Sequence, residues 1–315
     1  MQKIEKVLIA GAGAVGLMAA EAIYRYDPGA LAILAGGDRL RRYRENGLWV
    51  NGGRLDFVFA DPALENPAPF DLIIVACKNH QLPQVIADMK NFVGRETIIL
   101  SLLNGISSEQ IIGAAYGLWR LPLAMIIGTD SQNTGNGAAF TQRGIINFGD
   151  GEGKDTGRDR LIAAFLTQAA LPFEYHPAGM RRAQWYKFMI NVGLNQVSAL
   201  LMIPYGPFKR DSPTGIREVL ELTESAMEEA IAVANAEGVD LGAGDIEKFY
   251  QSTAKLDDRG FTSMCQDVRA RRKTEVELFG LTVMDYGKKH RIPTPVNEVL
   301  YRAIRVIEQN YCKDV

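Results

Sequence analysis

A lysine and two asparagines recur at four-residue intervals within the segment WYKFMINVGLN, as Lys187, Asn191 and Asn195. On an α-helix four residues advance by about 400°, so the sequence predicts that these side chains form one stripe along a helix. Hydrophobic residues flank the stripe, and polar groups buried among them would need partners. A lysine whose pKa is lowered by partial burial to about 7 to 8 can donate a proton and regain one, as a general acid does. The alternative is the exposed polar face of an amphipathic helix.

A hydroxyl and a carboxylate stand in a later segment, TSMCQDVRARRKTEVE. Ser263 is predicted to lie at a helix N-terminus, where it either helps to bind an anionic ligand or simply caps the helix. Glu275 is predicted about three turns further along the same helix, with Asp267 and Glu277 as competing acids. The basic residues in between leave a further interpretation open, a solvated ion-pair face.

A glycine-rich turn follows the first predicted strand, residues 4–10. Six residues make up this turn: Gly11, Ala12, Gly13, Ala14, Val15 and Gly16. In the pattern GxGxxG the first glycine permits a tight turn, the second lets a pyrophosphate approach the backbone, and the third lets the helix pack on the strand. The free amides at the start of that helix attract phosphates. Since the pattern lies between a strand and a helix, it predicts a dinucleotide site.

The second predicted strand, residues 31–35, should end where the adenosine ribose is recognised. An NAD site carries Asp or Glu there, whereas an NADP site uses basic residues. This strand is followed by two glycines, then by Asp38, and then by arginines that include Arg39 and Arg42. The arginines favour NADPH, with NADH as the alternative, and Asp38 is predicted to cap the next helix.

Polar residues also follow two further predicted strands. Lys78 follows the hydrophobic run 70–77, which is typical of a central parallel strand, and Asn104 follows the strand 97–100. In open α/β sheets ligands bind outside the carboxyl ends of the strands, so both side chains are predicted to lie at the cofactor site. The alternatives are a solvated lysine and an ordinary Asn-Gly turn.

The elements that position these residues form two predicted domains, residues 1–177 and 178–315. The first alternates strands and helices, which predicts a Rossmann-type α/β dinucleotide-binding domain. Its later strands are predicted at 121–128, at 144–148 in a hairpin after TGNG, and at 173–175. The second domain is predicted to be all-helical, with helices at 181–202, 214–237, 245–253, 264–289 and 295–309. Oxidoreductases of this plan often bind substrate between the two domains.

Composition excludes several classes of function. The 315 residues suffice for two ordinary domains, and a net charge of -2 without a long run of one sign argues against nucleic-acid and anionic-membrane partners. No hydrophobic run reaches the roughly 18 residues of a membrane span, and the chain begins with a strand rather than a leader. The three cysteines, Cys77, Cys265 and Cys312, lack CxxC spacing, so we expect no disulfide framework, no metal site and a cytoplasmic location.

Along nearly its whole length the chain resembles the ketopantoate reductase (2-dehydropantoate 2-reductase) family. GAGAVG resembles the dinucleotide turn of that family, ACKNHQ its cofactor lysine segment and LLNG its cofactor asparagine. The segments that contain Lys187 and Glu275 resemble its catalytic helix and its serine-glutamate segment, and they are far more specific than the glycine pattern. The resemblance implies a second domain similar to the C-terminal domain of 6-phosphogluconate dehydrogenase.

The resemblance also implies roles for single residues. Lys187 is the implied general acid, and Glu275 is implied to pair with it and with the cofactor side. The other implied ligands are Asn191, Asn195 and Ser263 for the substrate, Lys78 for the nicotinamide half of the cofactor, and Asn104 for both.

Three positions depart from the family pattern. Gln196 stands where the family usually has proline, and Tyr205 where it usually has a loop asparagine. Gly36-Gly37 replaces the arginine that usually ends the second strand. A contact to the 2′-phosphate is therefore left to Arg39 or Arg42.

The resemblance implies NADPH-dependent reduction of 2-dehydropantoate to pantoate, in pantothenate and coenzyme A biosynthesis. Hydride transfer to a ketone leaves a developing alkoxide that needs a proton donor, and of the three histidines only His80 lies near the predicted site as an alternative to the lysine. Two other functions stay open: reduction of another 2-oxo acid, and a catalytically silent NADP(H)-binding sensor. A homodimer is the expected assembly.

Overall fold

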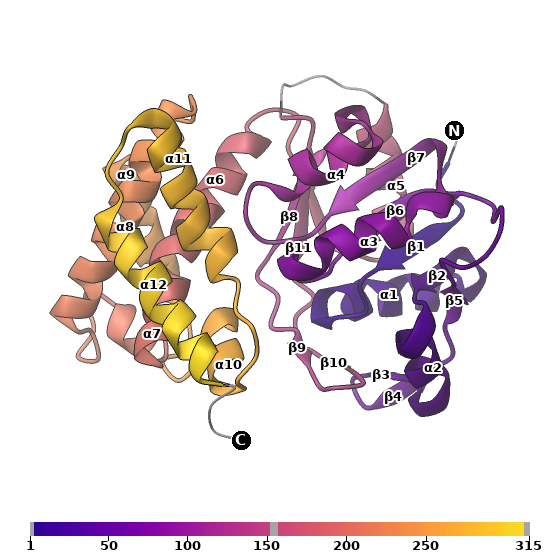
Figure 1. The fold of residues 1–315 in the computed structure, drawn as a ribbon, viewed down its shortest axis with the longest axis horizontal. Helices are drawn as coiled ribbons and strands as arrows, with labels where there is room; N and C mark the ends of the chain where they lie inside the picture. The colour runs from indigo at the N-terminus through magenta and orange to yellow at the C-terminus, as the bar shows by residue number, and fades with distance from the viewer. Residues whose placement is uncertain (1–2, 152–156, 312–315) are drawn as a thin grey trace. The chain divides into compact units, whose positions relative to one another are not determined.

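The computed structural model describes residues 3–151 and 157–311, which leaves Cys312 outside the described residues. The chain forms two compact units, Met1–Arg181 and Arg182–Val315 (Figure 1). Strands and helices alternate in the first unit, whereas the described residues of the second unit form helices and loops. The fold is thus a Rossmann-like α/β domain followed by an α-helical domain, as predicted.

A five-stranded parallel sheet forms the centre of the first unit, in the order β5-β2-β1-β6-β7. The strands are β5 (Val58–Ala60), β2 (Leu31–Leu34), β1 (Val7–Ala10), β6 (Phe70–Val75) and β7 (Val93–Ser101). The chain passes from β1 to β2 on one side and later returns to β6 on the other side of β1. The strand order therefore reverses at β1, which is the point where open α/β sheets bind ligands at the carboxyl ends of their strands.

Alternate residues of each strand pack into two hydrophobic layers. In β1, Val7 and Ile9 join the core that contains α1 and α5, whereas Leu8 and Ala10 join the core that contains α3 and α4. These helices are α1 (Ala14–Tyr26), α3 (Leu82–Asp88), α4 (Ser108–Tyr116) and α5 (Arg158–Gln168). A strand that is covered on both faces needs hydrophobic residues at every position, which explains the continuous runs in the sequence.

Two smaller sheets complete the first unit. One has the order β12-β11-β8 and the other β4-β3-β10-β9. Their strands are β12 (Phe173–Tyr175), β11 (Ile145–Gly149), β8 (Leu123–Ile127), β4 (Gly53–Leu55), β3 (Leu48–Val50), β10 (Gly137–Ala139) and β9 (Gln132–Asn133). The sequence did not predict the second of these sheets, because its strands have only two or three residues and leave no alternating pattern.

The hairpin predicted for residues 144–148 was wrong. The TGNG turn connects β9 to β10, whereas β11 pairs antiparallel with β8. Gly135 has a φ of 89°, and its amide donates to Asn133 Oδ1 at 2.8 Å, so the turn closes on the two short strands beside it.

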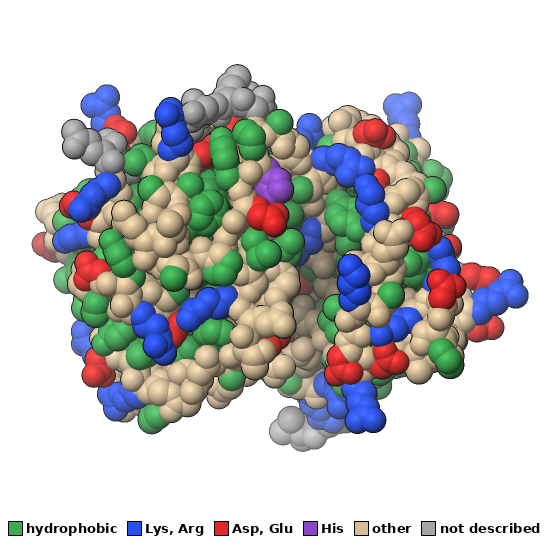
Figure 2. Space-filling model, turned by 180° about the vertical axis from the view of Figure 1, so that it is seen from behind, with side chains coloured by type: hydrophobic (Ala, Val, Ile, Leu, Met, Phe, Trp, Pro, Cys, Tyr) green, Lys and Arg blue, Asp and Glu red, His purple; other side chains and the backbone are tan. Residues whose placement is uncertain are grey.

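The second unit is built from helices. They are α6 (Met180–Ile190), the π-helical turn η5 (Asn191–Asn195), α7 (Gln196–Leu201), α8 (Arg217–Ala236), α9 (Ala243–Thr253), α10 (Ser263–Arg269), the π-helical turn η7 (Glu277–Leu281), α11 (Thr282–His290) and α12 (Pro295–Asn310). In the described part of the chain no helix is both long enough and apolar enough to cross a membrane. On the face drawn in Figure 2, Lys and Arg side chains are mixed with Asp and Glu side chains.

The single helix predicted for residues 264–289 was wrong. Helix α10 ends at Arg269, and Arg271 then adopts a left-handed conformation with a φ of 51°. The amide of Arg272 donates back to the Asp267 carbonyl at 2.8 Å, as in a Schellman motif. A glycine usually marks such a helix end, and the arginine in its place hid the break from the sequence pattern.

Candidate active site

The glycine turn of the first unit leaves room beside its second glycine. A Cβ on Gly11 would lie 2.7 Å from the Ala76 carbonyl, and a Cβ on Gly16 would lie 1.9 Å from the Gly11 carbonyl oxygen. Packing within the protein therefore requires both of these glycines. A Cβ on Gly13 would meet nothing nearer than the Ala76 carbonyl oxygen, at 3.8 Å. Packing within the protein therefore does not require a glycine at position 13. The close approach of a pyrophosphate to the backbone would require one.

Helix α1 begins directly after this turn. Gly13 is its N-cap residue and supplies no side-chain cap, and the first turn of the helix contains no acidic residue. Ala12, Ala14 and Val15 are half-buried. The first amides of the helix and the positive end of its dipole thus favour an anion here. The turn fits the pyrophosphate of a dinucleotide on chemical grounds.

A cavity of about 430 Å³ lies at the carboxyl end of β2. Its lining includes Gly36, Gly37 and the half-buried Arg39, together with Asp61 and Pro62. A Cβ on Gly36 would lie 2.9 Å from Pro62 Cδ, so a larger residue at position 36 would displace the proline. Arg39 is the cation that this cavity offers to a ligand.

The other residues of this segment point to different roles. Arg42 is exposed, does not line the cavity and lies with its guanidinium carbon 5.6 Å from the centre of the Tyr43 ring. Asp38 was predicted to cap the next helix, and this prediction was wrong. Helix α2 (Gly37–Asn46) already begins at Gly37 with Gly36 as its N-cap, and the Asp38 carboxylate pairs with Arg41 one turn further on.

Lys78 and Asn104 follow neighbouring strands of the parallel sheet. Strands β6 and β7 pair in parallel with Val75 opposite Ser101, and each polar residue lies three positions beyond its strand end. Both side chains are half-buried, and the backbone amide of Lys78 donates to Gln81 Oε1 at 3.3 Å. The two residues thus follow the carboxyl ends of strands that adjoin the switch point of the sheet.

In the second unit, Lys187 lies half-buried on α6, two residues after the aromatic side chain of Trp185. Trp185 packs edge-on against Phe188 and against Tyr286 of α11, with ring centres 5.6 and 5.4 Å apart. Burial lowers the pKa of Lys187 to about 8, while the negative charge of Glu275 acts in the opposite direction. Glu275 itself is buried, with 7% of its surface exposed. A lysine with such a pKa can exchange a proton near neutral pH.

The two competing acids have cationic partners of their own. Asp267 accepts a hydrogen bond from Arg272 Nε at 2.9 Å, and Glu277 lies 3.1 Å from Lys273. Glu275 is the carboxylate whose charge raises the pKa of the lysine. The structure thereby separates three acids that the sequence left as alternatives.

The polar stripe does not continue along an α-helix as predicted. Helix α6 ends at Ile190, and Asn191 to Asn195 form the π-helical turn η5, in which each turn contains more residues than in an α-helix. The angle of about 400° for four residues therefore fails after Lys187. The two asparagines still meet, because Asn195 Nδ2 donates to Asn191 Oδ1 at 3.3 Å. Asn191 is half-buried and Asn195 is buried.

Ser263 is the first residue of α10, and its side chain is exposed. The cap of this helix is Thr262, whose hydroxyl accepts from the Cys265 amide at 3.1 Å, so the capping role considered for Ser263 was wrong. Because the chain breaks after α10, Glu275 does not lie on the same helix as Ser263.

Two features of this unit were missed in the sequence. The π-helical turns η5 and η7 pack against each other, and such turns are frequent at functional sites. Each contains a glycine in close contact: a Cβ on Gly193 would lie 2.6 Å from Met227 Cγ, and one on Gly280 would lie 2.5 Å from Gln196 Oε1. A glycine within a helical pattern was the available signal.

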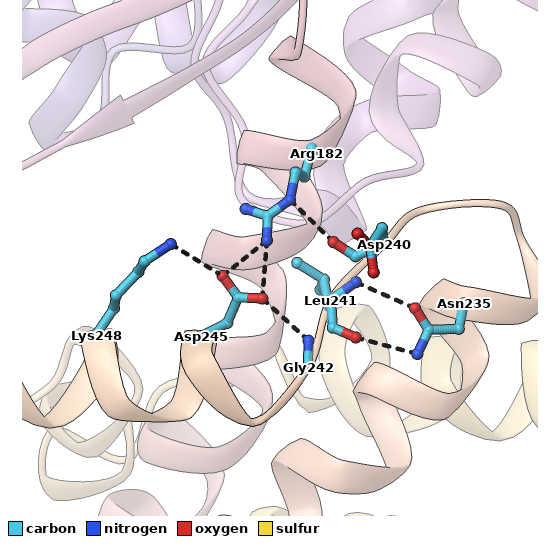
Figure 3. Close-up of polar contacts among 7 residues, drawn as sticks. All are labelled: Arg182, Asn235, Asp240, Leu241, Gly242, Asp245 and Lys248. Carbon is cyan, nitrogen blue, oxygen red and sulfur yellow. Dashed lines mark hydrogen bonds and ion pairs between the residues drawn. The ribbon is translucent and has the colours of Figure 1, made fainter.

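The second missed feature is the anchor of the Lys187 helix. Arg182 lies in the first turn of α6 (Figure 3). Its guanidinium donates hydrogen bonds to both carboxylate oxygens of Asp245, at 2.9 and 2.8 Å, and to the Asp240 carbonyl. Asp245 also accepts from the Gly242 amide at 3.0 Å. These contacts fix the start of α6 to the first turn of α9 and to the loop before it.

The three histidines lie in different surroundings. His176 Nε2 lies 2.7 Å from Asn147 Oδ1, and His290 pairs with Glu237. His80, the alternative proton donor, is exposed in the short helix η2 (Asn79–Gln81).

Family models for two consecutive regions match the chain. The model described as Ketopantoate reductase PanE/ApbA matches residues 7–153, and the one described as Ketopantoate reductase PanE/ApbA C terminal matches residues 179–308. The chain belongs to the ketopantoate reductase family. As a member of this family it is an oxidoreductase that acts on a CH–OH group, and its glycine turn suits a nicotinamide dinucleotide.

Curated relatives and solved structures match the chain over almost its full length. The 2-dehydropantoate 2-reductase of Streptococcus pyogenes is 28% identical over 307 residues, which cover 96% of this chain and 97% of that protein. A ketopantoate reductase from Ralstonia eutropha has a similar structure, with a TM-score of 0.79, 24% identity and coverage of 97% and 99%. A D-mandelate dehydrogenase solved with NADH and anilino(oxo)acetate has a TM-score of 0.85 at 21% identity, with coverage of 97% and 99%.

Proposed function

We propose that this protein reduces 2-dehydropantoate to pantoate with NADPH, and that Lys187 is the proton donor. The observation that carries the proposal is the half-buried lysine whose pKa is lowered to about 8, against the opposing charge of Glu275. At pH 7 a group with this pKa is protonated in roughly ten molecules out of eleven, so it is charged before the reaction and can still release its proton.

The proposed reaction divides between the cofactor and the protein. Bound NADPH supplies the hydride that goes to the carbonyl carbon of the 2-oxo acid. As the carbonyl oxygen gains negative charge, Lys187 Nζ donates a proton to it, and the product is a 2-hydroxy acid. The lysine is left neutral and regains a proton from water. Glu275 orients the ammonium group and keeps its pKa from falling further.

The remaining polar residues of the second unit are assigned to the substrate. Asn191 and Asn195 form an amide pair one turn beyond Lys187, and they bind the polar groups of the 2-oxo acid. Ser263, exposed at the start of α10, binds its carboxylate. Supporting this assignment, the hydroxyl is not used to cap its own helix.

The cofactor is assigned to the first unit. The backbone from Gly11 to Gly16 binds the pyrophosphate, Lys78 contacts the nicotinamide half, and Asn104 contacts both nicotinamide and substrate. Arg39, which lines the cavity at the end of β2, binds the 2′-phosphate, and Arg42 is the second candidate. Replacing Arg39 by alanine should raise KM for NADPH about tenfold and leave KM for NADH unchanged. The matched variant Arg42→Ala shows whether the exposed arginine contributes, and equal changes for both cofactors would contradict the assignment.

A second candidate substrate is an aryl 2-oxo acid, handled on the same scaffold and with the same proton donor. The solved D-mandelate dehydrogenase supports this alternative, since mandelate is an aryl 2-hydroxy acid. Tyr205 supports it as well: its ring lies 2.9 Å from the position of a Cβ on Gly260, three residues before Ser263. An aromatic side chain near α10 suits an aryl substrate better than a small branched one.

Steady-state kinetics distinguish these functions. Loss of nicotinamide absorbance is measured with 2-dehydropantoate, 2-oxo-2-phenylacetate and short-chain 2-oxo acids, each with NADPH and with NADH. The proposal expects the highest kcat/KM for 2-dehydropantoate with NADPH, and a higher value for the aryl acid would replace it. Binding of NADPH without turnover of any acid would instead support a catalytically silent sensor. With the preferred substrate, Lys187→Ala should lower kcat by about 10² to 10⁴ while NADPH still binds.

The proposal also includes an oligomeric state, a cellular location and a pathway. We expect a homodimer in the cytoplasm, within pantothenate and coenzyme A biosynthesis. The solved dimeric ketopantoate reductase from Staphylococcus aureus supports the first expectation. The free thiol of Cys265 suits a reducing compartment.

A further inference from the structure

Gln196 ties the two ends of the η5 turn together. It follows Asn195 directly, its side chain is fully buried, and its Nε2 donates to the Val192 carbonyl at 2.7 Å. Val192 in turn follows Asn191. One side-chain hydrogen bond therefore spans the segment between the two asparagines, and a side chain that enters the backbone ladder in this way changes the course of a helix.

The same amide connects the turn to two other helices. Gln196 Nε2 also donates to Oδ1 of the buried Asn297 on α12, at 2.9 Å. Asn297 Nδ2 donates to the Ala226 carbonyl at 3.1 Å and to Glu229 Oε2 at 2.8 Å, both on α8. Because Gln196 Nε2 faces two acceptors, the orientation of the glutamine amide is settled by its neighbours.

This arrangement carries a cost in stability. Gln196 Oε1 is buried, and among the described residues no donor reaches it. Gly280 of η7 leaves the room that this oxygen occupies, since a Cβ there would lie 2.5 Å away. A buried amide oxygen without a donor is unfavourable, and a methionine would fill the same space without that penalty. The benefit of the glutamine therefore lies in the geometry that it imposes on η5.

We propose that Gln196 and Asn297 are positioning residues that hold the η5 turn in its π-helical form and so set the spacing of Asn191 and Asn195. This inference rests on the proposed function in one respect, that the two asparagines bind the 2-oxo acid. Without the glutamine amide the segment relaxes toward α-helical hydrogen bonding, which rotates the two asparagine amides about the helix axis relative to Lys187 and away from the arrangement that binds substrate. Affinity for the 2-oxo acid then decreases, while the cofactor and the proton donor are unaffected.

The test compares Gln196→Met, Asn297→Leu and the double variant in the full-length protein. Each single variant should raise KM for the 2-oxo acid about fivefold to tenfold, with kcat and the Kd of NADPH changed less than about twofold. The double variant should raise KM no further than the single variant with the larger effect, because both single variants already remove the contact between Gln196 and Asn297. The matched control is Asn235→Leu, which removes an asparagine that bridges the backbone of Leu241 at 3.1 Å in the same unit (Figure 3). It should lower the melting temperature and leave KM unchanged.

A crystal structure of Gln196→Met supplies a readout that needs no substrate. We expect residues 191–195 to form an α-helical turn in this variant, with the side chains of Asn191 and Asn195 rotated about the helix axis relative to Lys187. An unchanged KM, additive effects in the double variant, or a retained π-helical turn would each overturn the proposal. If the wild-type protein reduces no 2-oxo acid, the proposed function fails, and the crystal structure alone decides whether Gln196 holds the turn. If Asn297→Leu does not fold, Gln196→Met decides both readouts.

Discussion

Replacing Glu275 by glutamine should shift the pH dependence of the reaction toward acid. The variant keeps the shape of the side chain and removes its charge. In the wild type, burial lowers the pKa of Lys187 from 10.5 to about 8, and Glu275 opposes part of that effect. Without the carboxylate the pKa must fall further. Since a nearby opposite charge is worth roughly 1 to 3 pKa units, the midpoint should move to about 7 or below.

The two directions of the reaction should respond with opposite signs. Reduction requires the protonated lysine, whose fraction at pH 8 falls from one half to about one tenth if the pKa drops by about one unit. The kcat for reduction at pH 8 should therefore decrease about fivefold, with little change at pH 6. Oxidation of the 2-hydroxy acid requires the neutral lysine, and its kcat at pH 7 should increase about fivefold for the same reason.

The assay is kcat at saturating substrate and cofactor, in both directions, from about pH 6 to pH 9.5. The matched control is Glu277→Gln, because Glu277 pairs with Lys273 and not with the proton donor. It should leave the midpoint in place. A midpoint in Glu275→Gln that is unchanged or moves toward alkaline pH would refute the role assigned to this carboxylate.

Three further variants test other parts of the structure. Gly13→Ala should keep the wild-type melting temperature, because the added Cβ would meet no atom closer than 3.8 Å. It should weaken NADPH binding at least about tenfold in calorimetric titration. A normal affinity would argue against a pyrophosphate at the turn. Lys187→Met should raise the melting temperature at pH 7 by a few degrees, roughly 2 to 4 °C, since the folded protein disfavours the charged lysine. The gain should shrink as pH rises from about 8 to 10.5, where the folded wild type loses its proton first, and a gain independent of pH would contradict the lowered pKa. Asp245→Asn should destabilise the protein by about 2 kcal/mol in urea unfolding, because it weakens the paired contacts to Arg182, and an unchanged midpoint would show that this anchor is dispensable.

Several parts of the site could be predicted from local sequence. The glycine turn was recognisable because a tight turn, a close approach and a packed helix each require a glycine at a fixed offset from the strand. The strands β1, β6 and β7 were recognisable because burial on both faces leaves continuous hydrophobic runs. Lys187 drew attention through its spacing from Asn191. These signals depend on residues near one another in the chain, so they can be recognised without knowledge of the fold.

Other parts were decided only by contacts between distant segments. The break after α10 depends on Arg271, which takes a left-handed conformation usually reserved for glycine, so nothing in the residue type marked the end of the helix. The choice of Glu275 among three acids depends on which carboxylates find arginine or lysine partners after folding. The π-helical turn η5 depends on Gln196, whose amide meets Asn297 from 101 positions away. The sequence determined which chemical groups follow one another on this helix. Tertiary packing determined the shape of the helix and which charged partners lie near each group.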